Sequence, residues 1–376
     1  MGGMVPRSYS CRMSIPLLTQ PLRIHAVTLP ARLIVAPMCQ YSAVDGCATD
    51  WHAVHIGGLA CGGFGLVVME ATAVEPRGRI TPQCLGIWGG SQEAALAQTV
   101  GRIRAVSSTP LGIQIAHAGR KASTYRPFRG EPKGAVPLHA GGWESVGPSS
   151  VAFGHLPAPR ALEEAELAAL RDAFRAAAAR AARIGFDYLE VHAAHGYLLA
   201  SFLSPLSNQR RDRWGGGLEG RMRFPLEVVR AVREEWPRDR VLGVRFGGSD
   251  WAEGGWTVEE ACEFGRALRA AGVDVLHVSS AGNAPVAPPM SPGWLVPHAA
   301  AVRAAAGGPV FAVGELQDPR LAEKVLQDGA ADAVAVARGA LRDPRLGWHA
   351  AEALGGRSTF VPQYEWAVAP PAPAAR

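Results

Sequence analysis

Two histidines and a tyrosine lie close together in the segment His192-Ala-Ala-His195-Gly-Tyr197. Two imidazoles at this spacing can both approach one carbonyl oxygen, while the phenol reaches a neighbouring carbon. The trio could stabilise the charge that forms when hydride adds to a C=C–C=O system, and a phenol with a pKa near ~10 could protonate the enolate carbon. From spacing alone, two other interpretations stay open. The cluster could be structural packing at a strand end, or the histidines could bind a metal in a lyase or hydrolase, given a third His, Asp or Glu ligand.

Hydride chemistry needs a redox cofactor, because no amino-acid side chain donates hydride. The chain has no Gly-x-Gly-x-x-Gly motif after a first strand, which disfavours a Rossmann nucleotide site. In a barrel, a phosphate binds after the last two strands, where backbone N–H groups and Arg338 are expected, and a single phosphate suits FMN. Arg245 could balance negative charge on a reduced flavin or belong to a structural ion pair. Gln114 could bind a flavin ring edge or be an ordinary strand residue.

The elements that position these residues follow from an alternation of short apolar runs with longer helical stretches, which is typical of a parallel sheet with crossover helices. We predict strands at 33–36, 65–70, 112–116, 188–192, 241–246, 274–278, 309–313 and 333–337. We predict helices at 51–61, 92–106, 162–184, 219–236, 257–271, 296–306, 319–327 and 340–354. Polar or reactive residues lie at the ends of seven of the strands: Cys39, Tyr41, Thr72, Gln114, His117, the His192–Tyr197 cluster, Arg245, Arg338 and, with its backbone, Gly314. Eight such units indicate an α/β protein with a closed (β/α)8 TIM barrel.

We expect a single barrel domain over residues 13–356. Residues 1–12 are interpreted as a disordered tail or a start-site artefact, and residues 357–376 as an extended C-terminal segment. The connection from Gly119 to Arg160 is rich in Gly, Pro and Ser and is too long for a simple crossover. It leaves the third strand at the catalytic end of the barrel, so we expect it to be a lid.

Composition excludes several classes of protein. With 48% hydrophobic and 19% charged residues, the chain suits a folded protein with a large core. Its charge of +5 comes from dispersed arginines without a basic block, and no apolar run is long enough to span a bilayer, so we expect neither a nucleic-acid nor a membrane partner. The six cysteines include no Cys-x-x-Cys pair, which disfavours a bound metal and favours a cytoplasmic location. Without a Ser/Cys-His-Asp order, the default for Cys39 is a buried structural thiol.

Several longer motifs occur together and in a constant order. They are Ala36-Pro-Met-Cys39-Gln-Tyr41-Ser42, Glu70-Ala-Thr-Ala-Val74, Gly78-Arg-Ile-Thr81, Gly112-Ile-Gln114-Ile-Ala-His117-Ala-Gly-Arg-Lys121, His192-Ala-Ala-His195-Gly-Tyr197, Phe202-Leu-Ser-Pro-Leu-Ser-Asn208 and Ala337-Arg338. In these motifs the chain resembles the Old Yellow Enzyme family of NADH:flavin oxidoreductases, specifically its bacterial branch of xenobiotic reductases and thermophilic-type ene-reductases. The resemblance extends over nearly the whole chain.

The resemblance implies an NAD(P)H-dependent enzyme in which bound FMN passes hydride to the β-carbon of enones, quinones, maleimides or nitro compounds. It implies FMN contacts from Ala36, Pro37, Met38, Cys39, Ala71, Gln114, Arg245, Gly314, Ala337 and Arg338. Cys39 would tune the flavin potential. The substrate would be lined by Tyr41, the two histidines and Tyr197, with the histidines holding its oxygen and Tyr197 as the proton donor. A flavin-binding protein without turnover is the alternative within this reading.

The resemblance also implies contact between subunits. Tyr364 and Trp366 are the candidates for a residue that enters a neighbouring subunit's substrate site, which would require a homodimer or a dimer of dimers. Either NADPH or NADH could be the hydride donor, and Arg120 and Lys121 make a 2′-phosphate contact plausible. One departure from the family pattern is Ala337, which stands where many relatives have glycine.

Overall fold

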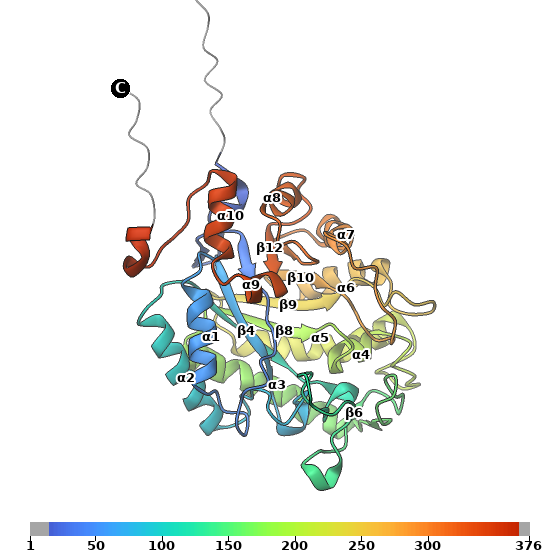
Figure 1. The fold of residues 1–376 in the computed structure, drawn as a ribbon. Helices are drawn as coiled ribbons and strands as arrows, with labels where there is room; N and C mark the ends of the chain where they lie inside the picture. The colour runs from blue at the N-terminus through green and yellow to red at the C-terminus, as the bar shows by residue number, and fades with distance from the viewer. Residues whose placement is uncertain (1–14, 368–376) are drawn as a thin grey trace, which may run out of the picture.

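Eight parallel strands form a closed barrel at the centre of the molecule (Figure 1). In order around the barrel they are β3 (Leu33–Val35), β4 (Leu66–Ala73), β5 (Leu111–Ala116), β8 (Tyr188–Ala193), β9 (Val241–Gly247), β10 (Val275–Ser279), β11 (Val310–Ala312) and β12 (Ala333–Val336). Strand β12 pairs with β3 and closes the ring. The structure is a computed structural model that describes residues 15–367. The predicted (β/α)8 barrel is confirmed.

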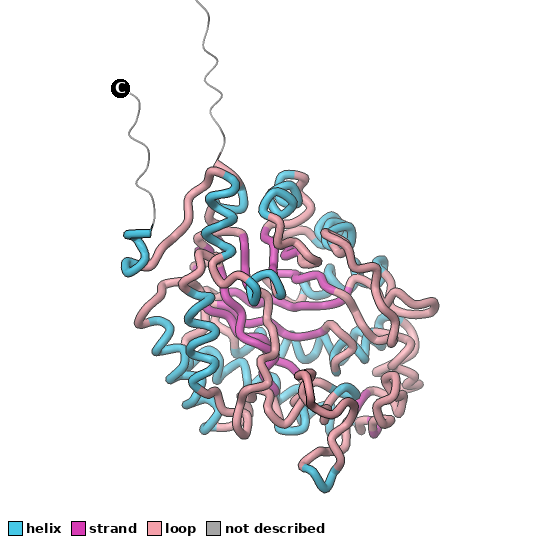
Figure 2. The backbone as a smooth tube through the Cα atoms, viewed as in Figure 1, coloured by secondary structure: helices cyan, strands magenta, loops and turns pink. Residues whose placement is uncertain are grey.

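Helices surround the barrel (Figure 2). They are α1 (Asp50–Ala60), α2 (Gly90–Arg104), α3 (Glu164–Ile184), α4 (Leu198–Leu203), α5 (Leu218–Glu235), α6 (Val258–Ala270), α7 (Val296–Ala306), α8 (Pro319–Gln327), α9 (Arg338–Arg342) and α10 (Leu346–Leu354). The prediction of one helix over 340–354 is wrong, because α9 ends before Pro344, whose ring and missing N–H disfavour a continuous helix. The short helix α4 was not predicted. No helix among residues 15–367 is long and apolar enough to cross a bilayer.

The strands separate two apolar cores, because alternate side chains point to opposite faces. Leu189 and Val191 of β8 belong to the large core between strands and helices, whereas Tyr188 belongs to a smaller core with Val68 and Phe311. This smaller core fills the barrel interior. The barrel is therefore a packed structure without a pore, as expected for eight strands.

One end of the barrel is closed by a hairpin that was not predicted. Its strands β1 (Leu22–Ile24) and β2 (Val27–Leu29) pair antiparallel, and Ile24 and Leu29 join the inner core beside Val241. Val241 is the first residue of β9, so the hairpin covers the amino ends of the strands. The functional site must then lie at the carboxyl ends, where barrel enzymes carry their catalytic groups.

The long connection after β5 extends along the carboxyl end and is drawn in green in Figure 1. It contains the 3-10 turns η3 (Gly119–Lys121) and η4 (Leu138–Ala140) and two short paired strands, β6 (Val146–Gly147) and β7 (Arg160–Ala161). At the C-terminus, the expected extended conformation is wrong for one stretch, because η5 (Pro362–Ala367) is a 3-10 helix. Residues 1–12, and the end of the chain after Ala367, lie outside the described residues.

Candidate active site

The register of neighbouring strands brings the predicted site residues together at the carboxyl end of the barrel. The aligned pairs are Ala71 with Gln114, Gln114 with Glu190, His192 with Arg245, and Arg245 with His277. A register shift between Met69 and Ala71 in β4 places Ala71 rather than Glu70 opposite Gln114. Such bulges re-aim side chains next to active sites.

The two histidines of the cluster are linked in a chain of hydrogen bonds. The backbone N–H of Ala194 donates to His192 Nδ1 at 3.1 Å, so the ring proton of neutral His192 is on Nε2. His192 Nε2 lies 3.2 Å from His195 Nδ1, and His195 Nε2 lies 2.9 Å from Ser279 Oγ. It follows that His192 Nε2–H donates to His195 Nδ1, and that His195 Nε2–H donates to Ser279 Oγ. A substrate oxygen that binds the histidines must replace one or both of these bonds.

The turn after β8 holds His195 in an unusual backbone conformation. Its φ is 59°, in the left-handed region that side chains rarely adopt, and Gly196 follows with φ 71°. A Cβ on Gly196 would lie 2.2 Å from the carbonyl oxygen of Gly282, so only glycine fits there. Lys121 Nζ donates to the carbonyl oxygen of His195 at 2.7 Å. The imidazole of His195 is therefore aimed by strained backbone, which is a feature of functional sites.

Burial keeps the titratable groups of this cluster neutral. Burial, helped by the positive charge of Arg245, lowers the pKa of His192 to about 3 and that of His195 well below its usual value. Burial also raises the pKa of Tyr197 well above its usual value. At neutral pH the cluster consists of two neutral imidazoles and a protonated phenol.

The Tyr197 ring packs edge-on against His192, with 5.0 Å between ring centroids. Its hydroxyl has no hydrogen-bond partner among the residues that the structure describes. Tyr41 has φ 52° and contacts Phe128 of the long connection edge-on at 5.9 Å between centroids. Burial raises the pKa of Tyr41 as well. Both phenols therefore keep their protons at neutral pH.

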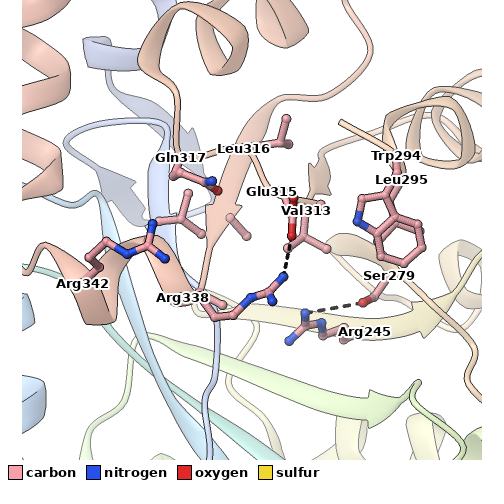
Figure 3. A pocket seen from close by; sticks show the side chains of 15 residues that line it. Arg245, Ser279, Trp294, Leu295, Val313, Glu315, Leu316, Gln317, Arg338 and Arg342 are labelled. Atoms are coloured by element: carbon pink, nitrogen blue, oxygen red, sulfur yellow. Dashed lines mark hydrogen bonds and ion pairs between the residues drawn. The ribbon is translucent and has the colours of Figure 1, made fainter. Parts of the chain in front are cut away.

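A cavity of about 390 Å³ opens beside this cluster, at the ends of β9–β12 (Figure 3). Its polar wall contains Arg245, Ser279, Glu315, Arg338 and Arg342. Arg338 donates to Glu315 at 2.7 Å, and Arg245 Nη2 lies 3.5 Å from Ser279 Oγ. With three arginines and one carboxylate, the cavity is suited to an anionic ligand.

Residues with small side chains line both the large cavity and a smaller one. Ala335, Ala337 and Gly314 line the large cavity. Ala71 and Ala116 line a small cavity together with Tyr197. Gly314 has φ 128°, and a Cβ there would lie 3.1 Å from the backbone nitrogen of Leu295. Small residues at these positions leave room for a flat ring against the strand ends.

These residues fit FMN. Arg245 is only 6% exposed, forms no ion pair within the described chain, and has a buried Nε without a hydrogen-bond partner. A buried guanidinium in this state calls for an anionic or acceptor group. The flavin ring would contact Arg245 and the small residues, and the phosphate would lie near Arg338, Gly314 and Ala337. Among residues 15–367, the structural ion pair that was the alternative for Arg245 is not found.

The other predicted cofactor residues lie on two neighbouring segments. The segment Ala36-Pro37-Met38-Cys39 follows β3, and the Ala36 N–H donates to the carbonyl oxygen of Val336 at 2.9 Å, directly before Ala337. Burial raises the pKa of Cys39 well above its usual value, so it is a thiol rather than a thiolate. Gln114 is buried in β5 and donates from Nε2 to Glu190 at 2.7 Å.

The side chains of three polar residues near the site are hydrogen-bonded within the protein and are not free to bind a ligand. Arg120 is 2% exposed and donates to the backbone carbonyls of Asn283, Val151 and Ala152, so the expectation that it binds a 2′-phosphate is wrong. Its role is to fasten the long connection to the loop after β10. His117 lies 2.8 Å from Glu75, and Thr72 donates to the Glu70 carbonyl.

Some site residues were missed from the sequence. Ser279 ends β10 and completes the histidine chain, and the rule that strand ends carry function would have found it. A second cavity of about 350 Å³ lies next to Tyr197, under the long connection. Its walls are mainly apolar and include Ile80, Phe153, Leu156 and Pro285, with Lys121 as the charged group. Residues from such distant segments share a cavity only after folding.

Two predictions concern other sites. Trp366 is 98% exposed and does not line its own chain's cavity, while Tyr364 packs against Trp348 and Arg345. A role for either in a neighbouring subunit stays a prediction. For the metal hypothesis, no group of three or more His, Cys, Asp or Glu in the described chain could hold an ion, so His192 and His195 lack the third ligand it requires.

Comparisons with known proteins bear on the family of the chain. Residues 17–355 match the family described as NADH:flavin oxidoreductase / NADH oxidase. The chain is 42% identical to an NADH:flavin oxidoreductase of Gibberella zeae over 92% of this chain and 88% of the relative. It is 39% identical to an NADPH dehydrogenase of Geobacillus thermodenitrificans, over 93% and 98% of the two chains. Its fold is similar to that of morphinone reductase in complex with tetrahydroNAD, with a TM-score of 0.74, 29% identity and 92% of each chain covered.

Proposed function

Since the chain belongs to the NADH:flavin oxidoreductase / NADH oxidase family, we propose that this NAD(P)H-dependent flavin oxidoreductase reduces the C=C bond of α,β-unsaturated carbonyl compounds. The observation that carries the proposal is the position of two neutral imidazole donors and a protonated phenol beside a cavity that fits FMN. Bound FMN, reduced by NADPH or NADH, supplies the hydride. The residues of the chain must then bind the substrate oxygen, orient the double bond and deliver a proton.

The substrate oxygen binds to His192 and His195. Both rings are neutral, so each offers one N–H, and the negative charge that develops on the oxygen is stabilised by these donors and by nearby Arg245. Neutral imidazoles donate hydrogen bonds to the substrate oxygen without transferring a proton to it. The proton that the α-carbon needs must therefore come from another group. When substrate is absent, the Ser279 hydroxyl oxygen accepts a hydrogen bond from His195 Nε2–H and keeps the ring oriented.

The proton for the α-carbon comes from Tyr197. Its hydroxyl has no partner in the described residues, and its raised pKa keeps it protonated. A free, protonated phenol next to the oxygen-binding pair is placed to act as a general acid. Tyr41 also keeps its proton but packs against Phe128, so we assign it to the pocket wall.

The apolar chamber beside Tyr197 accommodates the bulk of the substrate. Its volume of about 350 Å³ lies at the lower end of the range for small-molecule sites. The walls come from Phe153 and Leu156 of the long connection and from Ile80 and Pro285. We therefore expect cyclic and aryl-substituted enones, quinones and maleimides to be better substrates than short polar ones.

Isotope labelling tests the reaction directly. Purified protein is incubated without oxygen with 2-cyclohexenone and NADPH that carries deuterium at C4 of the nicotinamide. The expected product is cyclohexanone with deuterium at the β-carbon, and a reaction in D2O with unlabelled NADPH should place deuterium at the α-carbon. A protein that contains FMN and oxidises NADPH but leaves the enone unchanged would contradict the proposal and favour a flavin-binding protein without enone turnover.

A further inference from the structure

A buried carboxylate lies inside the barrel below the candidate active site and has no part in the mechanism above. Glu190 is in β8 and is 0% exposed. Its Oε1 accepts from Gln114 Nε2 at 2.7 Å. Its Oε2 accepts from the Tyr188 hydroxyl at 2.7 Å and from His277 Nδ1 at 2.8 Å. The residues come from β5, β8 and β10, so the network joins three strands of the barrel.

Glu190 is ionised. Burial by itself would raise the pKa of Glu190, but its interaction with His277, the positive charge of Arg245 and the hydrogen bond from Tyr188 outweigh that penalty and bring the pKa to about 2. Burial lowers the pKa of His277, so the ring is neutral and donates its single proton from Nδ1. Arg245 makes no ion pair in the described chain. The anion Glu190 and the cation Arg245 are therefore not in direct contact.

The strands next to β8 are shaped to admit this network. A Cβ on Gly243 would lie 2.0 Å from the Tyr188 hydroxyl, and a Cβ on Gly112 would lie 2.8 Å from the Tyr188 ring. Both glycines have negative φ, so their backbone conformation does not require glycine. Glycine is needed because a side chain at either position would collide with Tyr188. The tyrosine ring crosses toward β9 and presents its hydroxyl to Glu190.

A buried ionised network is a poor means of stabilising a barrel. Removing a carboxylate from water costs several kcal/mol, and well-packed apolar residues of similar size are often at least as stabilising. Elsewhere in the barrel interior such residues are present, including Val68, Val275 and Phe311. The polar network occurs at the level of Gln114, because Glu190 pairs with Gln114 and with Gly243. Gly243 lies two residues before Arg245, which lines the cavity that fits the flavin.

We propose that Glu190 is a positioning residue for the flavin, which fixes the Gln114 amide and supplies a negative charge that lowers the flavin's reduction potential. Because Glu190 accepts a hydrogen bond from one Nε2 proton of Gln114, the side-chain amide of Gln114 cannot flip. Gln114 then offers its Oε1 and its second N–H in a fixed order, which suits the alternating acceptors and N–H of a flavin pyrimidine ring. The anion opposes added negative charge on the flavin and so offsets Arg245. The inference rests on the flavin in the proposed function and is independent of the enone.

Two variants separate the two roles. Glu190→Gln removes the charge and allows Gln114 to turn, whereas Glu190→Asp keeps the charge but withdraws the carboxylate from Gln114. Tyr188→Phe is the matched control, because it removes one hydrogen bond while the charge and the Gln114 contact remain. Circular dichroism of each apoprotein checks that the barrel is folded.

The FMN dissociation constant is measured by fluorescence titration of each apoprotein, and the midpoint potential by dye equilibration of the flavin-loaded protein. For Glu190→Gln we expect binding of oxidised FMN to weaken about tenfold, for the loss of roughly one hydrogen bond to a fixed partner. We also expect the equilibrium between oxidised and reduced flavin to move about tenfold toward the reduced form. This corresponds to a shift of the two-electron midpoint potential by about 30 mV to a more positive value. Glu190→Asp should weaken binding with little shift, and Tyr188→Phe should change both by less than about threefold.

Wild-type affinity and potential in folded Glu190→Gln would overturn the proposal, since a purely structural carboxylate would alter stability alone. If that variant does not fold, unchanged FMN affinity in Glu190→Asp would overturn the positioning role. None of these readouts uses an enone. A protein that shows both shifts but does not reduce enones would therefore retract the proposed function and leave this inference standing.

Discussion

Replacing Tyr197 by phenylalanine isolates the proton-transfer step. The hydroxyl has no hydrogen-bond partner in the described residues, and the ring of phenylalanine can keep the edge-on contact with His192. Folding stability should therefore change by less than about 0.5 kcal/mol. General acid catalysis contributes about 10²–10⁴ in rate, which corresponds to about 2.7–5.4 kcal/mol of activation free energy. That loss should fall entirely on the step that consumes the enone.

The assay is anaerobic stopped-flow absorption, in which the two half-reactions are followed separately. Reduction by NADPH should keep its wild-type rate in Tyr197→Phe, and reoxidation by 2-cyclohexenone should slow by about 10²-fold or more. In the wild type, reoxidation should not vary from about pH 6 to 7, because burial holds the Tyr197 pKa above and the His192 pKa, about 3, below that window. Lys121 beside Tyr197, whose pKa burial lowers to about 8, stays protonated in it. Equal slowing of both half-reactions would refute the role of Tyr197, as would no slowing at all.

Further predictions concern the histidines, the barrel interior and the assembly. His192→Ala and His195→Ala should each weaken the binding of a phenol by about tenfold or more in a titration, since a hydrogen bond to a charged oxygen contributes about 1.5–3 kcal/mol; unchanged binding would contradict the oxygen-holding role. Gly243→Ala should lower the free energy of unfolding by about 2–4 kcal/mol, because its Cβ would meet the Tyr188 hydroxyl at 2.0 Å. Gly58→Ala is its control, with no atom within 4 Å of the added Cβ, and should be neutral or stabilising in denaturant melts. Light scattering should give the mass of two or four chains, with a monomer contradicting the proposed subunit contact through Trp366.

Much of the fold could be predicted from the sequence, because each barrel strand is a short apolar run followed by a helical stretch with its own end signals. Gly185 shows the principle, since it ends α3 in the left-handed conformation directly before β8. The hairpin of β1 and β2 was missed because its strands are only three residues each and half-exposed, so they give no clear alternation. The division of the last helix at Pro344 could have been predicted from the proline alone.

The candidate site was predictable where one strand end carries several reactive residues, as at His192, His195 and Tyr197. Contacts between distant segments were not. Position alone made Arg120 a candidate for a 2′-phosphate contact, yet it is buried against the backbone of Asn283. Glu190 resembled any residue of a buried strand until the register placed it beside Gln114. Such contacts depend on how strands that are far apart in the sequence pair around the barrel. Local sequence patterns carry little information about this pairing.

The central claim is that the His192–Tyr197 cluster serves a bound flavin that reduces enones. One absorption experiment tests it most directly. Purified protein should show flavin bands near roughly 370 and 450 nm; NADPH should bleach the 450 nm band without oxygen, and 2-cyclohexenone should restore it. A colourless protein that cannot be loaded with FMN, or a bleached flavin that the enone leaves unchanged, would contradict the account.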